Sequence, residues 1–388
     1  MGTTFLKPAS ILPKTRFATP NLTSLEFQVV RAKATESYNE FEQRVPLLSF
    51  HGAEDLLNRF INPTLPYNDT TKTGQAFFSG NLKVHEFGFT FDKNFTDGIF
   101  FSFEGTITNA IFDNIGVLPV SSTCRLLSEE EISQNAELTN YLKTFHNKFL
   151  ADSCEFTFKQ AGPLFFTLGY AKNFQHFEHA DFVDVSIKAG VAVPSINLNT
   201  TNSTDQNIFK IPTYSRVNIG IPIQASFEAG FYEWLNISAT GILIPFISND
   251  VIMRLNPTAT NNILLSQDQV LTKVRHHPFI YFDTYIAAEH LIPQFTCILG
   301  ISYAKQFKTT YQPCDMQKYP ESIVNKYSLH KPWEILSLTF EAEVDFSTIQ
   351  KQSFPRLKII YVHPIYGKSI YKSAVFAGQF ALEFSYDF

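Results

Sequence analysis

The chain has 388 residues, a net charge of −5 at pH 7 and 40 phenylalanines. The negative charge, and the lack of a basic stripe with interleaved aromatics, argue against nucleic acid as a partner. Charged residues make up 17% of the chain, below the roughly 25% of ordinary soluble domains. No run of about 18 apolar residues is present that would form a membrane helix.

Residues 1–22 are the first predicted region, a segment expected to be periplasmic or lumenal. Met1 to Pro20 lacks the basic start and apolar core of a secretory signal. Either a signal has been removed, with Met1 and Gly2 as an expression remnant, or the chain is not exported; we prefer the first reading. No linker, low-complexity tract or repeat divides the rest, so residues 23–388 are predicted to form one domain.

Twelve strands are predicted in this domain, each longer than the roughly 9–11 residues that a tilted strand needs to cross a bilayer. In chain order they lie near residues 23–35, 77–92, 98–115, 163–175, 181–194, 214–229, 233–253, 277–291, 294–308, 333–346, 354–366 and 374–388.

The links between these strands alternate in length. The tight links fall at 92–97, 175–180, 230–232, 292–293 and 347–353, and all the others except 367–373 are long. Adjacent antiparallel strands place successive links at opposite ends, so one end of the molecule carries turns and the other nearly all of the loop mass. This asymmetry is typical of transmembrane β-barrels, and a β-sandwich or propeller has no reason to show it.

Side chains along each predicted strand alternate between an apolar and a polar face. In 214–229, Ile219, Ile221 and Ile223 oppose Gln224 and Glu228. A polar second face would be unfavourable in a soluble core, but it suits a wet or hydrogen-bonded lumen.

The strand 77–92 departs from this alternation. Its apolar phase changes between Val84 and Phe87, which predicts a β-bulge near His85 and Glu86.

The last strand carries a motif, because Phe380, Leu382, Phe384, Tyr386 and Phe388 share one face and an aromatic residue ends the chain. This pattern resembles the closing strand of bacterial outer-membrane β-barrels, in which a terminal Phe after alternating aromatics is read by the assembly machinery. The resemblance implies an all-β, antiparallel transmembrane barrel of about 12 strands in the outer membrane of a Gram-negative bacterium. It also implies short periplasmic turns and long extracellular loops with small helices.

Charged residues on the predicted inner faces are the candidate lumen or selectivity residues. If the hairpin folds about residues 350–351, Asp345 opposes Arg356 and Glu343 opposes Lys358, and such cross-strand pairs stabilise by about 0.2–1 kcal/mol each. The cluster could form a cation-selecting constriction or a salt-bridge ladder that plugs a narrow barrel, and Lys83 is a further inward base. The candidates are Glu104, Asp184, Lys188, Arg216, Glu341, Glu343, Asp345, Arg356, Lys358 and Glu383.

The four cysteines suggest one disulfide. Cys124 and Cys154 bound the same long loop, and a bond between them is expected in an exported protein, with Cys314 as a rival partner. Cys297 matches the lipid face and is interpreted as an apolar filler. No Cys/His spacing indicates zinc.

Histidines give two weaker candidates. His176 and His179 share a tight turn that is more simply read as solvated than as a metal site. His276 and His277 begin a strand at the loop end, where outer-membrane hydrolases place catalytic groups, but no Ser-centred motif accompanies them.

These observations predict a porin-like channel for small hydrophilic solutes or ions, without cofactor or metal and without enzymatic activity. An adhesive or structural barrel that displays its loops to outside partners is the alternative, and a rim hydrolase is third. The expected partners are the lipid bilayer or detergent, the solutes and the assembly machinery, with homo-oligomerisation left open.

Overall fold

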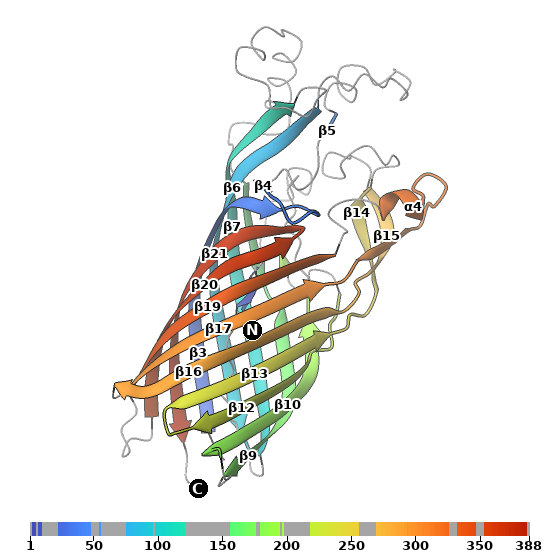
Figure 1. Ribbon diagram of the computed structural model, residues 1–388. Coiled ribbons are helices and arrows are strands. Elements are labelled where there is room, and N and C mark those ends of the chain that lie inside the picture. The colour runs from blue at the N-terminus through green and yellow to red at the C-terminus, as the bar shows by residue number, and fades with distance from the viewer. Residues whose placement is uncertain are drawn as a thin grey trace.

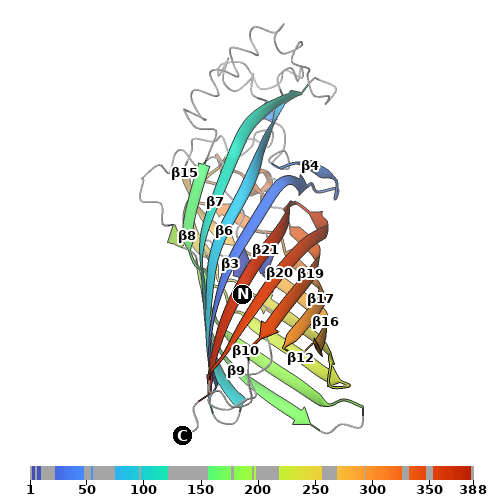
Figure 2. The same cartoon turned by 90° about the vertical axis from the view of Figure 1, so that its left-hand side faces the viewer.

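The structure is a computed structural model that describes residues 2–4, 7–9, 22–47, 54–55, 75–95, 98–120, 156–175, 179–194, 196–197, 218–255, 269–292, 294–325, 332–346 and 353–385. Twelve antiparallel strands in these ranges form a closed barrel (Figures 1 and 2). They are β3 (Leu22–Tyr38), β6 (Gln75–Asn94), β7 (Ile99–Val120), β9 (Leu164–Gln175), β10 (Phe182–Val193), β12 (Ile223–Phe231), β13 (Leu235–Ile244), β16 (Phe279–Ile292), β17 (Phe295–Gln306), β19 (Trp333–Asp345), β20 (Ser353–Lys368) and β21 (Ile370–Ser385).

Each barrel strand pairs with the next one in this order, and the last pairs back with the first. The ladder between β21 and β3 runs from Ile370↔Tyr38 to Ser385↔Leu22. The fold class predicted from the sequence, an all-β antiparallel barrel of about 12 strands, is confirmed.

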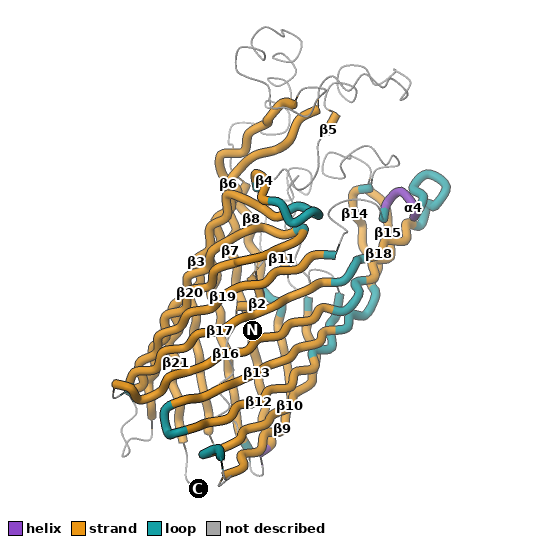
Figure 3. The backbone as a smooth tube through the Cα atoms, in the orientation of Figure 1, coloured by secondary structure: helices purple, strands orange, loops and turns teal. Residues whose placement is uncertain are grey.

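The remaining elements lie mostly at the end of the barrel with the long links, which we call the loop end; the opposite end is the turn end (Figure 3). β4 (Arg44–Pro46) pairs with β3, β5 (Glu54–Asp55) with β6, β8 (Phe156–Ala161) with β7, and β11 (Ile196–Asn197) with β8. β14 (Asn249–Arg254), β15 (Gln269–Arg275) and β18 (Thr310–Pro313) form a separate sheet beside the short helix α4 (Glu321–Val324). β1 (Gly2–Thr4) and β2 (Lys7–Ala9) form a hairpin.

No helix in the described ranges has the length and apolar character needed to span a membrane.

The alternating faces set the inside and outside of the barrel. On β12 every second residue from Ile223 to Phe227 is exposed and the residues between them are buried. The exposed positions are large and apolar around much of the wall, for example Ile187, Leu299 and Ile359. So extended an exposed apolar surface would be unfavourable in water but suits hydrocarbon.

The register between β19 and β20 was predicted correctly. The ladder pairs Glu343 with Lys358 and Asp345 with Arg356. The link from β20 to β21 is shorter than predicted, a single residue, Ser369, whose amide donates to the Asn39 carbonyl.

The bulge predicted near His85 and Glu86 is wrong. The ladder to β3 passes through Arg31↔His85 and Val30↔Glu86 without a shift, and the irregularity in β6 lies between Ser79 and Asn81. Leu82 and Val84 face inward, on the same side as Glu86, and both are fully buried. The apolar phase changes because the inner face itself becomes apolar toward the loop end.

Candidate functional site

The turn-end half of the inner wall carries buried and half-buried charged side chains, which we call the lumenal charge belt. Parity places them inside because they alternate with lipid-facing residues such as Phe340 and Ile359. The belt consists of Glu26, Glu104, Lys188, Glu341, Glu343, Arg356, Lys358 and Glu383.

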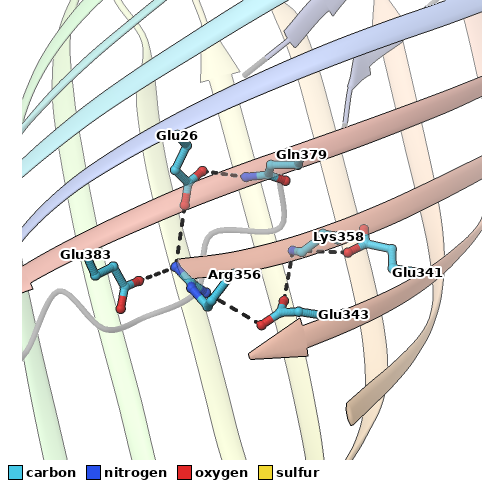
Figure 4. A network of polar contacts seen from close by, with 7 residues as sticks. All are labelled: Glu26, Glu341, Glu343, Arg356, Lys358, Gln379 and Glu383. Carbon is cyan, nitrogen blue, oxygen red and sulfur yellow. Dashed lines mark hydrogen bonds and ion pairs between the residues drawn. The ribbon is translucent and has the colours of Figure 1, made fainter. Parts of the chain in front are cut away.

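Arg356 on β20 is the centre of the larger part of the belt (Figure 4). Its Nη2 donates to Glu383 Oε1 on β21 and lies 3.6 Å from Glu26 Oε1 on β3, and its Nη1 lies 3.8 Å from Glu343 Oε1 on β19. Gln379 Nε2 donates to Glu26 Oε2 over 2.6 Å. One guanidinium therefore joins four neighbouring strands, which its planar fork of donors allows.

Lys358 extends this network by two residues along β20. Its Nζ lies 3.2 Å from Glu341 Oε2 and 3.6 Å from Glu343 Oε2. Glu343 is thus shared by the two cations, and both cations are buried. Because charges removed from water need compensation, the mutual pairing explains why so many ionisable groups are stable here.

A second charge pair lies on the next arc of the wall. Lys188 on β10 reaches across β9 to Glu104 on β7, with 2.8 Å between Nζ and Oε1. Ser102 Oγ donates to the same Glu104 oxygen over 3.4 Å. Like the Arg356 network, this pair follows the wall between nearby strands.

Acids outnumber bases on the described inner wall, since Glu86, Asp184, Glu228 and Asp283 also lie on inward positions beside the belt. Charges in a low-dielectric enclosure interact more strongly than in bulk water, and a lining of one excess sign raises the local concentration of counter-ions. The arrangement can therefore attract cations.

Several uncharged polar groups on the described inner wall have no protein partner. Both polar atoms of the Gln28 side chain and the hydroxyls of Thr240, Ser337 and Thr339 are buried and have no hydrogen-bond partner in the described part of the chain. Such a group costs about 1–3 kcal/mol when it stays dry. The inner wall is therefore suited to contact with water.

The other predicted site residues lie in different places. Asp184 faces the lumen and accepts a hydrogen bond from Asn173 Nδ2. Phe384 lies on the outer face, paired with Ser353 and Thr23. Arg216, Tyr386, Phe388, Cys124 and Cys154 are outside the described residues.

The prediction that Lys83 faces inward is wrong. Lys83 is exposed on the outer face of β6 and forms an ion pair with Asp113 on β7. The outward position of Lys83 follows from the absence of the predicted bulge. Without a bulge there, the odd-numbered residues of this part of β6 face outward.

The remaining candidates are cysteines and histidines. Cys297 and Cys314 are free and exposed. His276 Nδ1 lies 2.9 Å from Thr309 Oγ1, and its ring packs edge-on against Phe246. Burial, and then the neighbouring His277, lower the pKa of His276 to about 4. Within the described residues no group of His, Cys, Asp or Glu side chains is arranged to hold a metal ion.

Sequence reasoning missed the bridging role of Gln379, and the apolar part of the inner wall. Parity on β21 places Gln379 inside between Ala377 and Ala381, so the signal was present. Alternation alone does not distinguish an amide that bridges strands from any other inward polar side chain.

No protein-family model matches the chain, and no curated protein matches it. Among solved structures, it is similar to an outer-membrane channel from Pseudomonas putida F1, with a TM-score of 0.50 and 9% identity over 98% of this chain and 100% of that one. Matches to the transport unit of the autotransporter AIDA-I from Escherichia coli (TM-score 0.38, 7% identity, 97% and 94% covered) and to the CymD monoaromatic hydrocarbon channel (0.34, 10%, 95% and 89%) are too distant to support an argument. At these identities the likeness concerns the fold alone. The chain has the fold of outer-membrane β-barrels, and its resemblance is to this architecture and not to one family.

Proposed function

We propose that the protein is an outer-membrane channel of a Gram-negative bacterium that passes small hydrophilic solutes with a preference for cations. The observation that carries this proposal is the lumenal charge belt, an excess of inward carboxylates on the wall of a closed barrel. The outer-membrane assembly machinery is taken to insert the protein, which is taken to have no enzymatic role and no cofactor.

The geometry of the belt favours a lining over a structural plug. The Arg356 and Lys358 contacts connect the neighbouring strands β19, β20, β21 and β3, and Lys188 with Glu104 connects β10 and β7. A plug made of ion pairs would connect opposite walls. Inward hydroxyls and amides without protein partners, such as Gln28 and Thr339, further favour a hydrated path.

Planar-bilayer recording with a KCl gradient tests the proposal. The wild-type chain should give current steps and a reversal potential of cationic sign. Replacing Glu341, Glu343 and Asp345 together by Gln, Gln and Asn should move the reversal potential toward zero, because it removes negative charge from the lumen.

Glu334→Gln is the matched control, since Glu334 lies on the same strand but on the outer face, where it accepts hydrogen bonds from Tyr303 and Tyr366. It should leave selectivity unchanged. A bilayer without current steps would show that the barrel is a closed scaffold. Unaltered selectivity in the triple variant would show that the belt is only a structural ladder of salt bridges.

We also propose that residues 1–22 are lumenal rather than periplasmic. The β1–β2 hairpin lies within the outline of the barrel in two perpendicular views (Figures 1 and 2), and β1 contacts β6 and β7. Deleting residues 2–20 should then increase single-channel conductance, whereas a periplasmic segment would leave it unchanged.

A scaffold that binds outside partners is the second candidate function, and one surface favours it. Ile252 on β14 and Leu271 on β15 are ladder partners in the loop-end sheet, with 68% and 48% of their surfaces exposed. Exposed apolar pairs outside a membrane are typical of contact surfaces. If this function holds, replacing both residues by Ser should abolish binding of the outside partner to the loop-end sheet. It should not change conductance.

A further inference from the structure

The lumen contains an apolar layer at its loop end, which we call the apolar collar. It is one cluster of buried inward side chains that includes Ile242 and Ile244 of β13, Phe279 and Tyr281 of β16, Ile335 of β19 and Ile370 of β21. Each of these six side chains is between 0 and 6% exposed. The collar side chains are thus as buried as those of a protein core.

The collar follows the inner wall from strand to strand. Ladder partners connect its members, with Phe165 facing Ala192, Ile244 facing Phe279 and Ala304 facing Ile335. Every neighbouring pair of barrel strands in the described chain is hydrogen-bonded. The wall has no gap between strands, so a solute that moves along the barrel axis passes the collar on its way.

Two glycines fit the collar closely. A Cβ on Gly220 of the stretch before β12 would lie 2.8 Å from Ile244 Cγ2, and a Cβ on Gly367 of β20 would lie 3.0 Å from Ile370 Cγ2. At these two positions the wall has no room for a further side chain, because neighbouring apolar groups fill the space.

The hydroxyl of Tyr38 distinguishes the collar from an ordinary dry core. The hydroxyl of Tyr38, on β3, is buried within the cluster and has no hydrogen-bond partner in the described residues. Buried hydroxyls in a purely structural core are normally satisfied, because an unmade bond is unfavourable. A hydroxyl held this way is suited to a transient partner that enters the collar.

Resting on the proposed channel function, we propose that the apolar collar selects solutes that combine an apolar body with a cationic group. A hydrated ion loses its water at an apolar constriction without compensation. An aromatic or branched aliphatic group replaces the side-chain contacts that it disrupts, and the excess carboxylates of the belt then receive the cationic end. The substrate class is small amphipathic organic cations.

Permeability to benzyltrimethylammonium relative to choline tests this, because both carry the same trimethylammonium head and only the first carries an aromatic group. Bi-ionic reversal potentials of the wild-type channel should favour benzyltrimethylammonium about tenfold, as expected for recognition of one apolar group. Ile244→Asn should reduce the ratio toward one while the K⁺ conductance is kept or raised. Ile244→Val, which keeps the collar apolar, should retain the preference.

The outcomes separate this inference from the proposed function. If no cation gives current, the channel function itself fails. If K⁺ passes but the wild-type ratio is near one, or if Ile244→Asn leaves a high ratio unchanged, only the collar inference is overturned. Loss of the heat-dependent gel shift would show that Ile244→Asn does not fold, and Ile335→Asn then takes its place. If both variants fail to fold, the wild-type permeability ratio of benzyltrimethylammonium to choline decides.

Discussion

Arg356 is the residue on which most lumenal contacts converge. Arg356→Met would leave Glu383, Glu26 and Glu343 close together without the guanidinium that joins them. Removing one partner of a buried pair typically costs about 3–5 kcal/mol. We expect the variant to unfold at markedly lower urea concentration in detergent.

The double variant Arg356→Met with Glu383→Gln is the control for this prediction. It removes one of the uncompensated charges and should recover part of the lost stability. Equal stability of Arg356→Met and wild type would contradict the role of Arg356 as a structural centre.

His276 predicts a pH dependence at the loop end. Its pKa in the fold is about 4, below the ordinary 6.5, because burial disfavours the charged ring. The unfolded chain therefore binds more protons between these values, and stability should fall as the pH is lowered from about 6.5 to about 4, by at most about 1.4 kcal/mol per pH unit. Thermal unfolding across this range should show the decrease, and His276→Gln should lessen it.

At the scale of the element, glycines report how closely strands and the collar pack. Gly220→Val would place atoms against Ile244, Phe246 and Ala192, whose nearest atoms lie 2.8–3.3 Å from an ideal Cβ. Such overpacking costs about 1–3 kcal/mol. Gly241→Val on β13 is the matched control, because nothing lies within 4 Å of its ideal Cβ. We expect a lower melting temperature for the first variant and an unchanged one for the second.

The strands themselves could be predicted from the sequence because a side-chain period of two depends on local geometry alone. The register of β19 and β20 followed from the length of one turn, since the pairs Glu343–Lys358 and Asp345–Arg356 need no distant information. The partners of Arg356 on β21 and β3 could not be predicted in this way. They depend on the tilt of the wall and on which long side chains meet across it.

The bulge in β6 was a wrong prediction for a related reason. A uniformly polar inner face would require a phase change at Leu82 and Val84, because both are apolar. In the structure Leu82 pairs with Phe112 and Val84 with Ala110 of β7, and all four are buried. Periodicity identifies the two faces of a strand. It does not show whether the inner face is polar or apolar at a given position along the barrel axis.

At the scale of the whole molecule, the wall changes polarity along its axis. Near the turn end it is apolar outside and polar inside, as with Phe340 and Glu341 on β19. Toward the loop end the same strand turns Glu334 outward and Ile335 inward. Detergent should therefore cover only the turn-end part of the barrel, and nitroxide labels at outward positions of β19 should change from detergent-accessible to water-accessible near Glu334.

The aromatic end of the chain gives a further prediction about the whole molecule. Removing Phe388 should block assembly into the membrane, because the closing strand then loses the terminal residue of its motif. The heat-dependent shift on an unheated gel measures assembly. Normal insertion of the truncated chain would weigh against recognition of this strand by the assembly machinery.

Polar contacts also join β21, the last strand of the barrel, to β3, the first. Lys372 holds Glu36, and Gln379 holds Glu26, across 336 and 353 residues of chain. Such contacts form only after nearly the whole polypeptide has been synthesised. The barrel therefore cannot close during translation, and the nascent protein must be kept from aggregating until β21 is available.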